Sequence, residues 1–335
     1  MSMEDASRHV MQLLSGYMVT QSIRAVVEAG VPDALADGPL DLATLAERTK
    51  TNADALRRVI RALASVGLFQ ETSPSKFALT SAGQLLRSGV RGSMRDTALF
   101  FGGDMYDAWS HIGHSLRTGE TAANLAFGAE HFEYMARAPE AAALFDRAMQ
   151  GGLSARLPVL EARAWDTVKT VVDVGGGNGT LLAALLSAHP HLQGVLFDLP
   201  HVADRGRERL AAEGLAARCR VVGGDFFDAV PEGGDVYVLA RVLHDWDDAR
   251  AVRILQTCRA AMRPDAVLFV LDDVVPEGDT PHPSKWIDLQ MLVVTGGRER
   301  SRAEWETLLA AGGFRAQRFL ERGRGMAVEA APHPT

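Results

Sequence analysis

Apolar residues follow two different spacings along the chain, and the change of spacing separates a helical first half from a mixed second half. From about residue 4 to residue 36, apolar side chains recur every three or four positions, which predicts helices. The apolar positions of this segment include Val10, Leu13, Leu14, Met18, Ile23, Val26 and Val27. They extend nearly all around the expected helices. Such a surface must be buried, either within its own domain or against a second subunit.

The next segment has the pattern of a winged helix. It predicts helices at residues 42–48 and 53–66, and then two strands at 68–71 and 77–80 that are joined by a turn at 73–76. A further helix is predicted at 81–87. Asn52 is a good N-cap for the second helix, and Gly67 is expected to end it.

Winged helices often bind DNA, and the second predicted helix carries Arg57, Arg58 and Arg61. A DNA-binding regulator is therefore one hypothesis for this protein. Against it, the predicted wing holds Lys76 as its one cation and the segment is not basic overall. Three arginines on one helix are more often a solvated face.

Residues from about 94 to 165 are expected to be helical and are rich in aromatic side chains. These are Phe100, Phe101, Tyr106, Trp109, Phe127, Phe132, Tyr134 and Phe145. Most are expected in the core, but some could line a pocket for a flat organic molecule, since such pockets are largely apolar. A long helix is predicted around residues 140–164, with an interruption near Gly151 and Gly152.

Beyond Thr170 the pattern changes to strands that alternate with helices. Strands are predicted at residues 170–174, 194–198, 219–223, 235–240 and 266–272, with helices at about 180–188, 201–213 and 247–262. A last helix at 302–311 precedes two strands at 314–321 and 325–330. Alternation with nearly continuous apolar strands predicts an α/β domain, whose mostly parallel sheet is covered on both faces. The expected domains are 1–92, 93–165 as a helical middle, and 166–335.

A cluster of four glycines follows the first of these strands. Glycine permits positive φ and has no Cβ, so a ligand can lie against the backbone of Gly175 and Gly177. Asp198 ends the next strand, where an acidic residue can bind both hydroxyls of a ribose. The dinucleotide fingerprint fits poorly because Thr180 takes the place of its last glycine. We therefore expect an adenosyl ligand without a pyrophosphate, such as S-adenosylmethionine; the alternative is a turn that only packs a helix onto the sheet.

Polar residues gather where the predicted parallel strands end. They are Asp198, Asp225, Arg241, His244 and Asp272. A histidine just beyond a strand end at a ligand-binding rim is a candidate general base, although a lone histidine is more often a surface or core residue. Asp272, or Glu299 before the last helix, could accept a hydrogen bond from one ring nitrogen and leave the other free to take a proton.

Composition narrows the possible partners. A net charge of −7 gives no electrostatic footprint for nucleic acid or an anionic membrane. The two cysteines, Cys219 and Cys258, have no metal-ligand spacing and little scope for a disulfide framework, which favours a reducing cytoplasm and no bound metal. The sequence has no apolar run of membrane-spanning length and no signal-peptide core.

Five motifs together carry a family resemblance that covers nearly the whole chain. They span residues 173–179, 197–200, 224–227, 243–246 and 297–300. With them the chain resembles small-molecule O-methyltransferases of the plant caffeic acid and bacterial natural-product type. The resemblance implies a C-terminal Rossmann-like catalytic domain and an N-terminal helical and winged-helix dimerisation domain. It also implies a homodimer that pairs through the N-terminal helices, no nucleic-acid or membrane partner, and a role in secondary metabolism such as antibiotic biosynthesis.

The resemblance assigns a cofactor site for S-adenosylmethionine. Its matching residues are Asp173, Gly175, Gly177, Asp198, Asp225, Phe226 and Arg241. By analogy, the two glycines lie against the methionyl part, Asp198 binds the ribose, and Asp225 with Phe226 holds the adenine. Arg241 matches less closely, because the plant enzymes carry a lysine one residue earlier, where Ala240 stands here.

The resemblance also implies a reaction. A hydroxyl of an aromatic acceptor attacks the sulfonium methyl in line, His244 removes the proton with Asp272 and Glu299 beside it, and S-adenosylhomocysteine is the product. Plant members carry glutamate where Asp272 stands. The implied acceptor-binding residues are Tyr106, Phe145, Met149, Asp245 and Met291. Two alternatives stay open: a member that binds the cofactor but performs another reaction, such as hydroxylation, and a DNA-binding regulator that senses S-adenosylmethionine.

Overall fold

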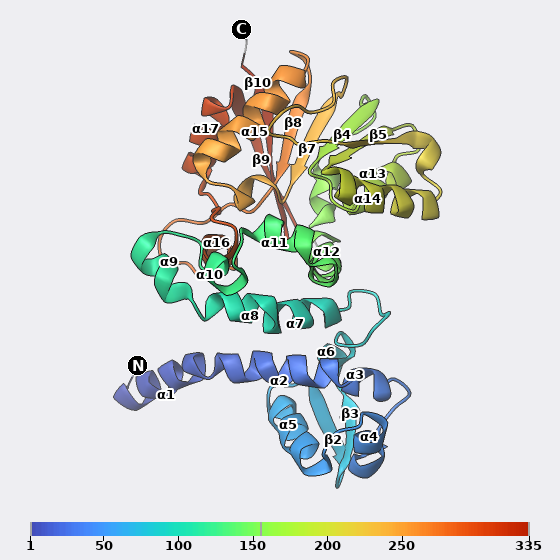
Figure 1. Ribbon diagram of the computed structural model, residues 1–335, viewed down its shortest axis with the longest axis vertical. Coiled ribbons are helices and arrows are strands. Elements are labelled where there is room, and N and C mark those ends of the chain that lie inside the picture. Colours follow the sequence, from blue (N-terminus) through green and yellow to red (C-terminus); the bar gives the residue numbers. More distant parts are fainter. Residues whose placement is uncertain (1, 155, 334–335) are drawn as a thin grey trace. The chain divides into compact units, whose positions relative to one another are not determined.

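The computed structural model describes residues 2–154 and 156–333, which form two compact units (Figure 1). The first unit comprises Met1–Asp107 with Ala138–Gly151, and the second comprises Ala108–Arg137 with Gly152–Thr335. The expected helical middle is thus divided between the two units. No helix in the described residues is long and apolar enough to cross a membrane.

The first unit has the predicted winged-helix order. Its elements up to residue 102 are α1 (Met3–Leu14), α2 (Gly16–Glu28), α3 (Val31–Ala34), β1 (Leu40–Asp41), α4 (Leu42–Arg48), α5 (Ala53–Ser65), β2 (Phe69–Ser73), β3 (Lys76–Leu79), α6 (Ser81–Gln84) and α7 (Arg95–Gly102). The strands form an antiparallel sheet in the order β1-β3-β2, of which β1 was not predicted. Asn52 caps α5 as expected, since its side chain accepts a hydrogen bond from Ala55 N at 3.0 Å. Helix α6 is three residues shorter than predicted, because turn hydrogen bonds replace the helical ones after Gln84.

The helices between residues 104 and 162 contain two corrections. These helices are α8 (Asp104–Trp109), α9 (Ile112–Thr118), α10 (Ala123–Phe127), α11 (His131–Arg137), α12 (Pro139–Ser154) and the 3-10 helix η1 (Leu157–Ala162). The first correction is that the long helix expected at residues 140–164 ends as an α-helix at Ser154. The predicted break at Gly151 and Gly152 is wrong, because α12 continues through both glycines to Ser154. A glycine inside a helix costs only about 1 kcal/mol relative to alanine, which the neighbouring helical residues can offset.

The second unit contains the predicted α/β domain together with residues 108–137 and 152–165. Its seven-stranded sheet has the order β6-β5-β4-β7-β8-β10-β9. The parallel strands are β4 (Thr170–Val174), β5 (Gln193–Asp198), β6 (Cys219–Gly223), β7 (Val236–Ala240) and β8 (Val267–Leu271); β10 (Gly325–Pro332) pairs antiparallel with β8 and with β9 (Phe314–Arg322). Each strand lies within two residues of its expected position at either end.

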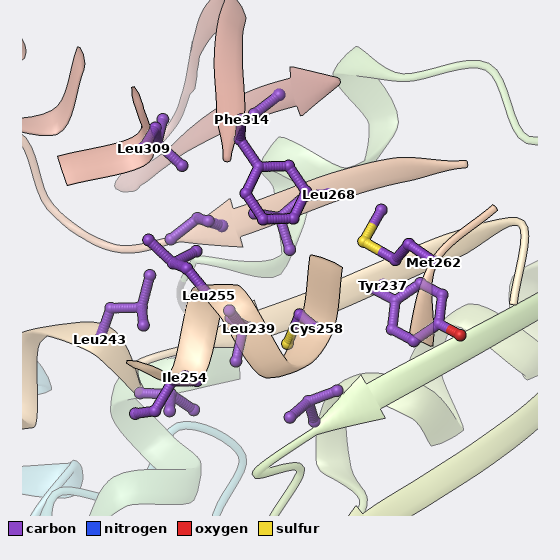
Figure 2. Close-up of a cluster of buried hydrophobic side chains, with 14 of the residues drawn as sticks. Tyr237, Leu239, Leu243, Ile254, Leu255, Cys258, Met262, Leu268, Leu309 and Phe314 are labelled. Carbon is purple, nitrogen blue, oxygen red and sulfur yellow. The ribbon is translucent and has the colours of Figure 1, made fainter. Parts of the chain in front are cut away.

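Two hydrophobic cores cover the faces of this sheet, because successive strand residues point to opposite sides. Val172 belongs to the core that includes α15 (Asp248–Ala261) and α17 (Arg302–Ala311), and this core is drawn in Figure 2. Its neighbour Val171 belongs to the core that includes α13 (Thr180–Ala188) and α14 (Pro200–Ala212). Burial on both faces confirms the expectation from the nearly continuous apolar strands. Helix α16 (Ser284–Val294) was not predicted.

Leu255 provides a test of the core shown in Figure 2, because its side chain is fully buried there. Leu255→Ala should lower the free energy of unfolding by about 2–5 kcal/mol, since the lost methyl groups leave a cavity. Leu116→Ala is the matched control: the same change at a side chain that is 85% exposed should stay within about 0.5 kcal/mol. Urea denaturation of both variants measures the difference, and equal losses would contradict the assigned core.

Candidate active site and cofactor-binding site

The parallel strands of the second unit all run in one direction, so the residues that follow them meet at one edge of the sheet. Gly175 follows β4, Asp198 ends β5, Arg241 follows β7 and Asp272 follows β8. The structure therefore places the predicted cofactor and base residues of different strands at a common rim.

The glycine turn needs glycine at two positions for different reasons. Gly175 has a φ of 68°, and a Cβ there would lie 2.8 Å from a methyl of Val242. Gly177 has a φ of 58°, and nothing lies within 4 Å of where its Cβ would be. The second turn residue thus borders open space, where a ligand can approach the backbone.

Two aspartates lie at this turn and differ in their partners. Asp198 accepts a hydrogen bond from Gly177 N at 2.8 Å. Asp173 is fully buried below the turn, and neither of its carboxyl oxygens has a hydrogen-bond partner in the described part of the chain. Burial, with a smaller contribution from the charge of Asp198, raises the pKa of Asp173 to about 7.

Asp225 and Phe226, which are the residues expected near an adenine, lie beside a cavity and the glycine turn respectively. Asp225 helps to line a cavity of about 620 Å³, together with Phe197 and Gly224. The ring of Phe226 comes within 3.6 Å of where a Cβ on Gly175 would lie, and its edge packs against Trp246. An apolar ring is thus available at the turn, and a carboxylate lines the cavity.

His244 lies in the 3-10 helix η3 (Leu243–Asp245) directly after β7 and is only 4% exposed. Its Nδ1 is 2.8 Å from Oε1 of Glu299, as the sequence predicted for one of the two carboxylates. A carboxylate accepts but cannot donate, so this contact assigns the proton to Nδ1 and leaves Nε2 unprotonated in the neutral ring. The nearest carboxylate to Nε2 is that of Asp245, with Oδ1 at 3.6 Å.

Asp272, the other carboxylate expected beside His244, makes no hydrogen bond to it. The side chain is 1% exposed, and neither oxygen has a partner among the described residues. Burial is the main reason that the pKa of Asp272 rises to about 7, while His244 and Arg241 act in the opposite direction. Asp272 therefore affects the histidine through its charge and not through a direct contact.

Arg241 points at carboxylates. Its Nη1 lies 3.1 Å from Oδ2 of Asp273 and 3.2 Å from Oε1 of Glu299. The same oxygen of Asp273 also accepts a hydrogen bond from Arg156 at 3.0 Å. The contact between Arg241 and the cofactor, expected by resemblance, stays a prediction. Sequence reasoning missed Asp273 and Arg156, although the doubled aspartate after β8 was a signal for at least one of them.

The pKa of His244 is set by opposing influences. Burial is the largest and lowers it, and the Arg241 guanidinium lowers it further. The carboxylates of Asp245, Glu299 and Asp272 together outweigh both, so the pKa lies above its usual 6.5. The neutral ring is consequently a stronger base than an ordinary histidine, but it is available only at a higher pH.

The predicted acceptor-binding residues belong to both units. Met291 and the neighbouring Gln290, both on α16, are buried in the second unit. Tyr106, Phe145 and Met149 belong to the first unit, in which Phe145 packs against Phe100 at 5.6 Å between ring centroids. For all of these residues, and for Asp245, contact with an acceptor stays a prediction.

Comparison with known proteins identifies the family. Residues 109–315 match the model of the O-methyltransferase domain, and residues 11–89 match that of the O-methyltransferase dimerisation domain. The chain therefore belongs to the O-methyltransferases, which confirms the resemblance and the enzyme assignment. The dimerisation match also supports pairing through the N-terminal helices, where α1 leaves Val10, Leu13 and Leu14 more than half exposed.

Three relatives illustrate the similarity. Phenazine O-methyltransferase PhzM of Lysobacter antibioticus is 44% identical over 326 residues, which is 96% of this chain and 95% of the relative. The 8-amino-8-demethylriboflavin N,N-dimethyltransferase of Streptomyces davaonensis is 40% identical, over 87% of this chain and 85% of the relative. The crystal structure of NcsB1, an O-methyltransferase from neocarzinostatin biosynthesis, in complex with S-adenosylmethionine and 2-hydroxy-5-methyl naphthoic acid, has a TM-score of 0.82 and 34% identity, covering 93% of this chain and 95% of that chain.

The cofactor is S-adenosylmethionine, as in these methyltransferases, and the rim fits it. Gly177 borders open space, Asp198 presents a carboxylate next to that glycine, and Asp173 holds an unpartnered carboxyl below the turn. Carboxylates suit the ribose hydroxyls and the ammonium group of this cofactor. In the described residues no group of three or more His, Cys, Asp or Glu side chains could hold a metal ion.

Gly297 tests how closely the loop that carries Glu299 must approach the histidine. A Cβ on Gly297 would lie 2.0 Å from His244 O and 2.6 Å from Trp246 N, and backbone atoms cannot move aside singly. Gly297→Ala should therefore shift Glu299 relative to His244 and lower turnover about 100-fold, because an error of about 1 Å in a catalytic geometry has that effect.

The measurement is S-adenosylhomocysteine formation, with the melting temperature recorded for each variant. Gly113→Ala is the control, since a Cβ there would meet only the end of the flexible Arg117 side chain, at 3.4 Å. Wild-type turnover in Gly297→Ala would show that the close approach of this loop is not required.

Proposed function

We propose that this protein transfers the methyl group of S-adenosylmethionine to a phenolic hydroxyl of an aromatic small molecule in bacterial natural-product biosynthesis, and that His244 is the general base. The observation that carries this proposal is the 2.8 Å hydrogen bond between His244 Nδ1 and Glu299 Oε1. It orients a buried imidazole and leaves Nε2 able to accept a proton.

The cofactor would be held at the rim already described. Gly175 and Gly177 would contact its methionyl part, Asp198 its ribose, and Asp225 with Phe226 its adenine. When bound, S-adenosylmethionine supplies an electrophilic methyl group on a sulfonium. The buried position of His244 keeps water away from the base, which favours reaction of the acceptor over hydrolysis.

The base strength of His244 decides how the acceptor loses its proton. A phenol pKa of about 10 exceeds that of an ordinary histidine by roughly 3.5 units, or about 5 kcal/mol for complete transfer before reaction. The carboxylates around His244 raise its pKa and so reduce this gap. The remainder is avoided if proton removal accompanies methyl transfer, or if the phenol is acidified by its substituents.

An aromatic amine is the second candidate acceptor. The riboflavin-type relative described above is an N,N-dimethyltransferase by name, at 40% identity to this chain. A neutral base beside the acceptor serves an amine as well, because an amine also loses a proton after methylation. The buried His244–Glu299 pair favours the hydroxyl, since a phenol needs its proton removed for nucleophilicity whereas an amine already has a free lone pair.

The deciding experiment is titration calorimetry with S-adenosylmethionine, followed by mass spectrometry of phenols and arylamines incubated with enzyme and cofactor. A phenol heavier by one methylene supports the proposal, and methylation of arylamines alone would replace it with N-methylation. Hydroxylated products would favour the non-methylating alternative. Absence of cofactor binding would contradict the whole assignment.

Removal of the base gives a sharper prediction. His244→Ala should lower kcat by about 100-fold or more, as expected for loss of a general base. Binding of S-adenosylhomocysteine should survive, because the residues assigned to the cofactor are other than His244. Turnover assays measure kcat, and calorimetry on the same preparation measures the binding of S-adenosylhomocysteine.

His191→Ala is the matched control, because this histidine lies just before β5, at the opposite end of the parallel strands, where its Nε2 is 3.1 Å from the carbonyl of Trp165. It should keep wild-type kcat. Full turnover in His244→Ala would remove the histidine from the mechanism while leaving the family assignment intact.

A further inference from the structure

A chain of largely buried charges extends from Arg156, at the start of η1, to the imidazole of His244. Arg156 lies 3.0 Å from Asp273, Asp273 lies 3.1 Å from Arg241, and Arg241 lies 3.2 Å from Glu299, which in turn binds His244 at 2.8 Å. All five residues belong to the second unit. Since buried charges are costly unless they are paired, this arrangement requires an explanation beyond the histidine–glutamate pair.

Arg241 and His244 share one oxygen atom. Oε1 of Glu299 is the contact atom both for Nη1 of Arg241 and for Nδ1 of His244, whereas Oε2 has no hydrogen-bond partner in the described residues. The negative charge that would hold a proton on the imidazole is therefore partly neutralised by the guanidinium. The influence of Arg241 on the histidine passes through this shared oxygen and through direct repulsion.

The backbone of Arg241 is held in an unusual conformation. Its φ is 60°, a region that residues other than glycine occupy at a cost of about 1–3 kcal/mol and only where their surroundings enforce it. Its N–H donates to Leu271 O at 3.0 Å, which fixes the residue at the junction of β7 and β8. The side chain is anchored at its other end by Asp273, itself held by Arg156. The cation is thus fixed beside the carboxylates.

The charges that face His244 are strongly unbalanced without this arginine. Asp245 comes from η3, Asp272 follows β8, and Glu299 comes from the loop before α17; Arg241 is the cation that faces them from the end of β7. Acidic groups around one buried imidazole, Asp273 among them, favour imidazolium, which has no lone pair on Nε2 and cannot accept a proton. A base that stays protonated is of no use to the reaction.

We propose that Arg241 is a positioning residue that acts through Glu299: it balances the acidic groups around His244, so that the histidine releases its proton and returns to its neutral form at physiological pH. Asp273 and Arg156 hold the arginine in place for this role. The inference rests on the proposed function of His244 as the base, and it gives Arg241 a role different from the cofactor contact expected by resemblance.

The test is a pH titration of His244, monitored by NMR of the full-length protein labelled with 13C at histidine Cε1. The signal of His244 is identified by its absence from the spectrum of His244→Ala. Arg241→Met removes the cation and should raise the pKa of His244 by about one unit or more, as loss of a neighbouring charge does. Arg241→Lys restores the charge and should reverse most of this shift. Arg241→Gln is a second neutral variant that retains a hydrogen-bond donor, for use where the methionine variant does not fold.

Arg163→Met is the matched control, because Arg163 is also a largely buried arginine but pairs with Glu329. It should lose stability without moving the titration of His244. An unchanged or lower His244 pKa in both neutral Arg241 variants would overturn the proposal, as would an equal shift in Arg163→Met.

The pH profile of kcat/KM gives the functional counterpart. Because His244 acts only when neutral, a raised pKa moves the acidic limb of the profile to higher pH, and turnover lost in Arg241→Met at pH 7 should recover at alkaline pH. Dissociation constants for S-adenosylhomocysteine should change little. A uniform loss at all pH values, with weaker cofactor binding, would instead assign Arg241 to the cofactor. The NMR titration needs no acceptor, so failure to detect methylation would count against the proposed function and not against the charge balance.

Discussion

The arrangement of side chains at the edge where the parallel strands end depends on the hydrogen bond between His244 and Glu299, two residues 55 positions apart in the sequence. Neither residue could hold the other without the frame around them. Arg298 N donates to His244 O at 2.8 Å, and the fully buried Arg300 donates to the carbonyls of Leu243 and Trp246, both at 3.0 Å. The motif around Glu299 therefore does more than supply a carboxylate, since its arginines bind the backbone of the turn that carries the histidine.

This frame also explains why so many charges are buried at one edge of the sheet. A buried carboxylate without a partner costs several kcal/mol. Glu299 avoids this cost because Arg241 and His244 both donate to one of its oxygens, so that its pKa falls below the usual value despite burial. Asp272 has no such partner, and its pKa rises instead. Two carboxyl groups at the same edge thus differ in protonation because their contacts differ.

Hydrophobic spacing was sufficient to predict the parallel sheet and its helices, because strands buried on both faces are nearly continuous apolar runs. It failed for α16, whose residues lie between Pro283 and Gly296 without a clear polar face. Motif matching placed His244, Asp272 and Glu299 at one rim, but could not tell which carboxylate would meet the ring, since this depends on side-chain direction. The positive φ of Arg241 and its turn toward Asp273 have no signal in the sequence at all.

His244, Glu299 and the glycine turn all belong to the second unit, whereas Tyr106, Phe145 and Met149, expected at the acceptor, belong to the first. The His244–Glu299 pair proposed for proton removal is thus built within a single compact body with its own two cores. Two relatives are named for a phenazine and a riboflavin derivative, and a third, NcsB1, was crystallised with a naphthoic acid; their identities to this chain span 34–44%. Tyr106, Phe145 and Met149 take no part in the His244–Glu299 pair, so a change of acceptor at these three positions is compatible with the same pair, whereas Asp245 and Met291 share its unit.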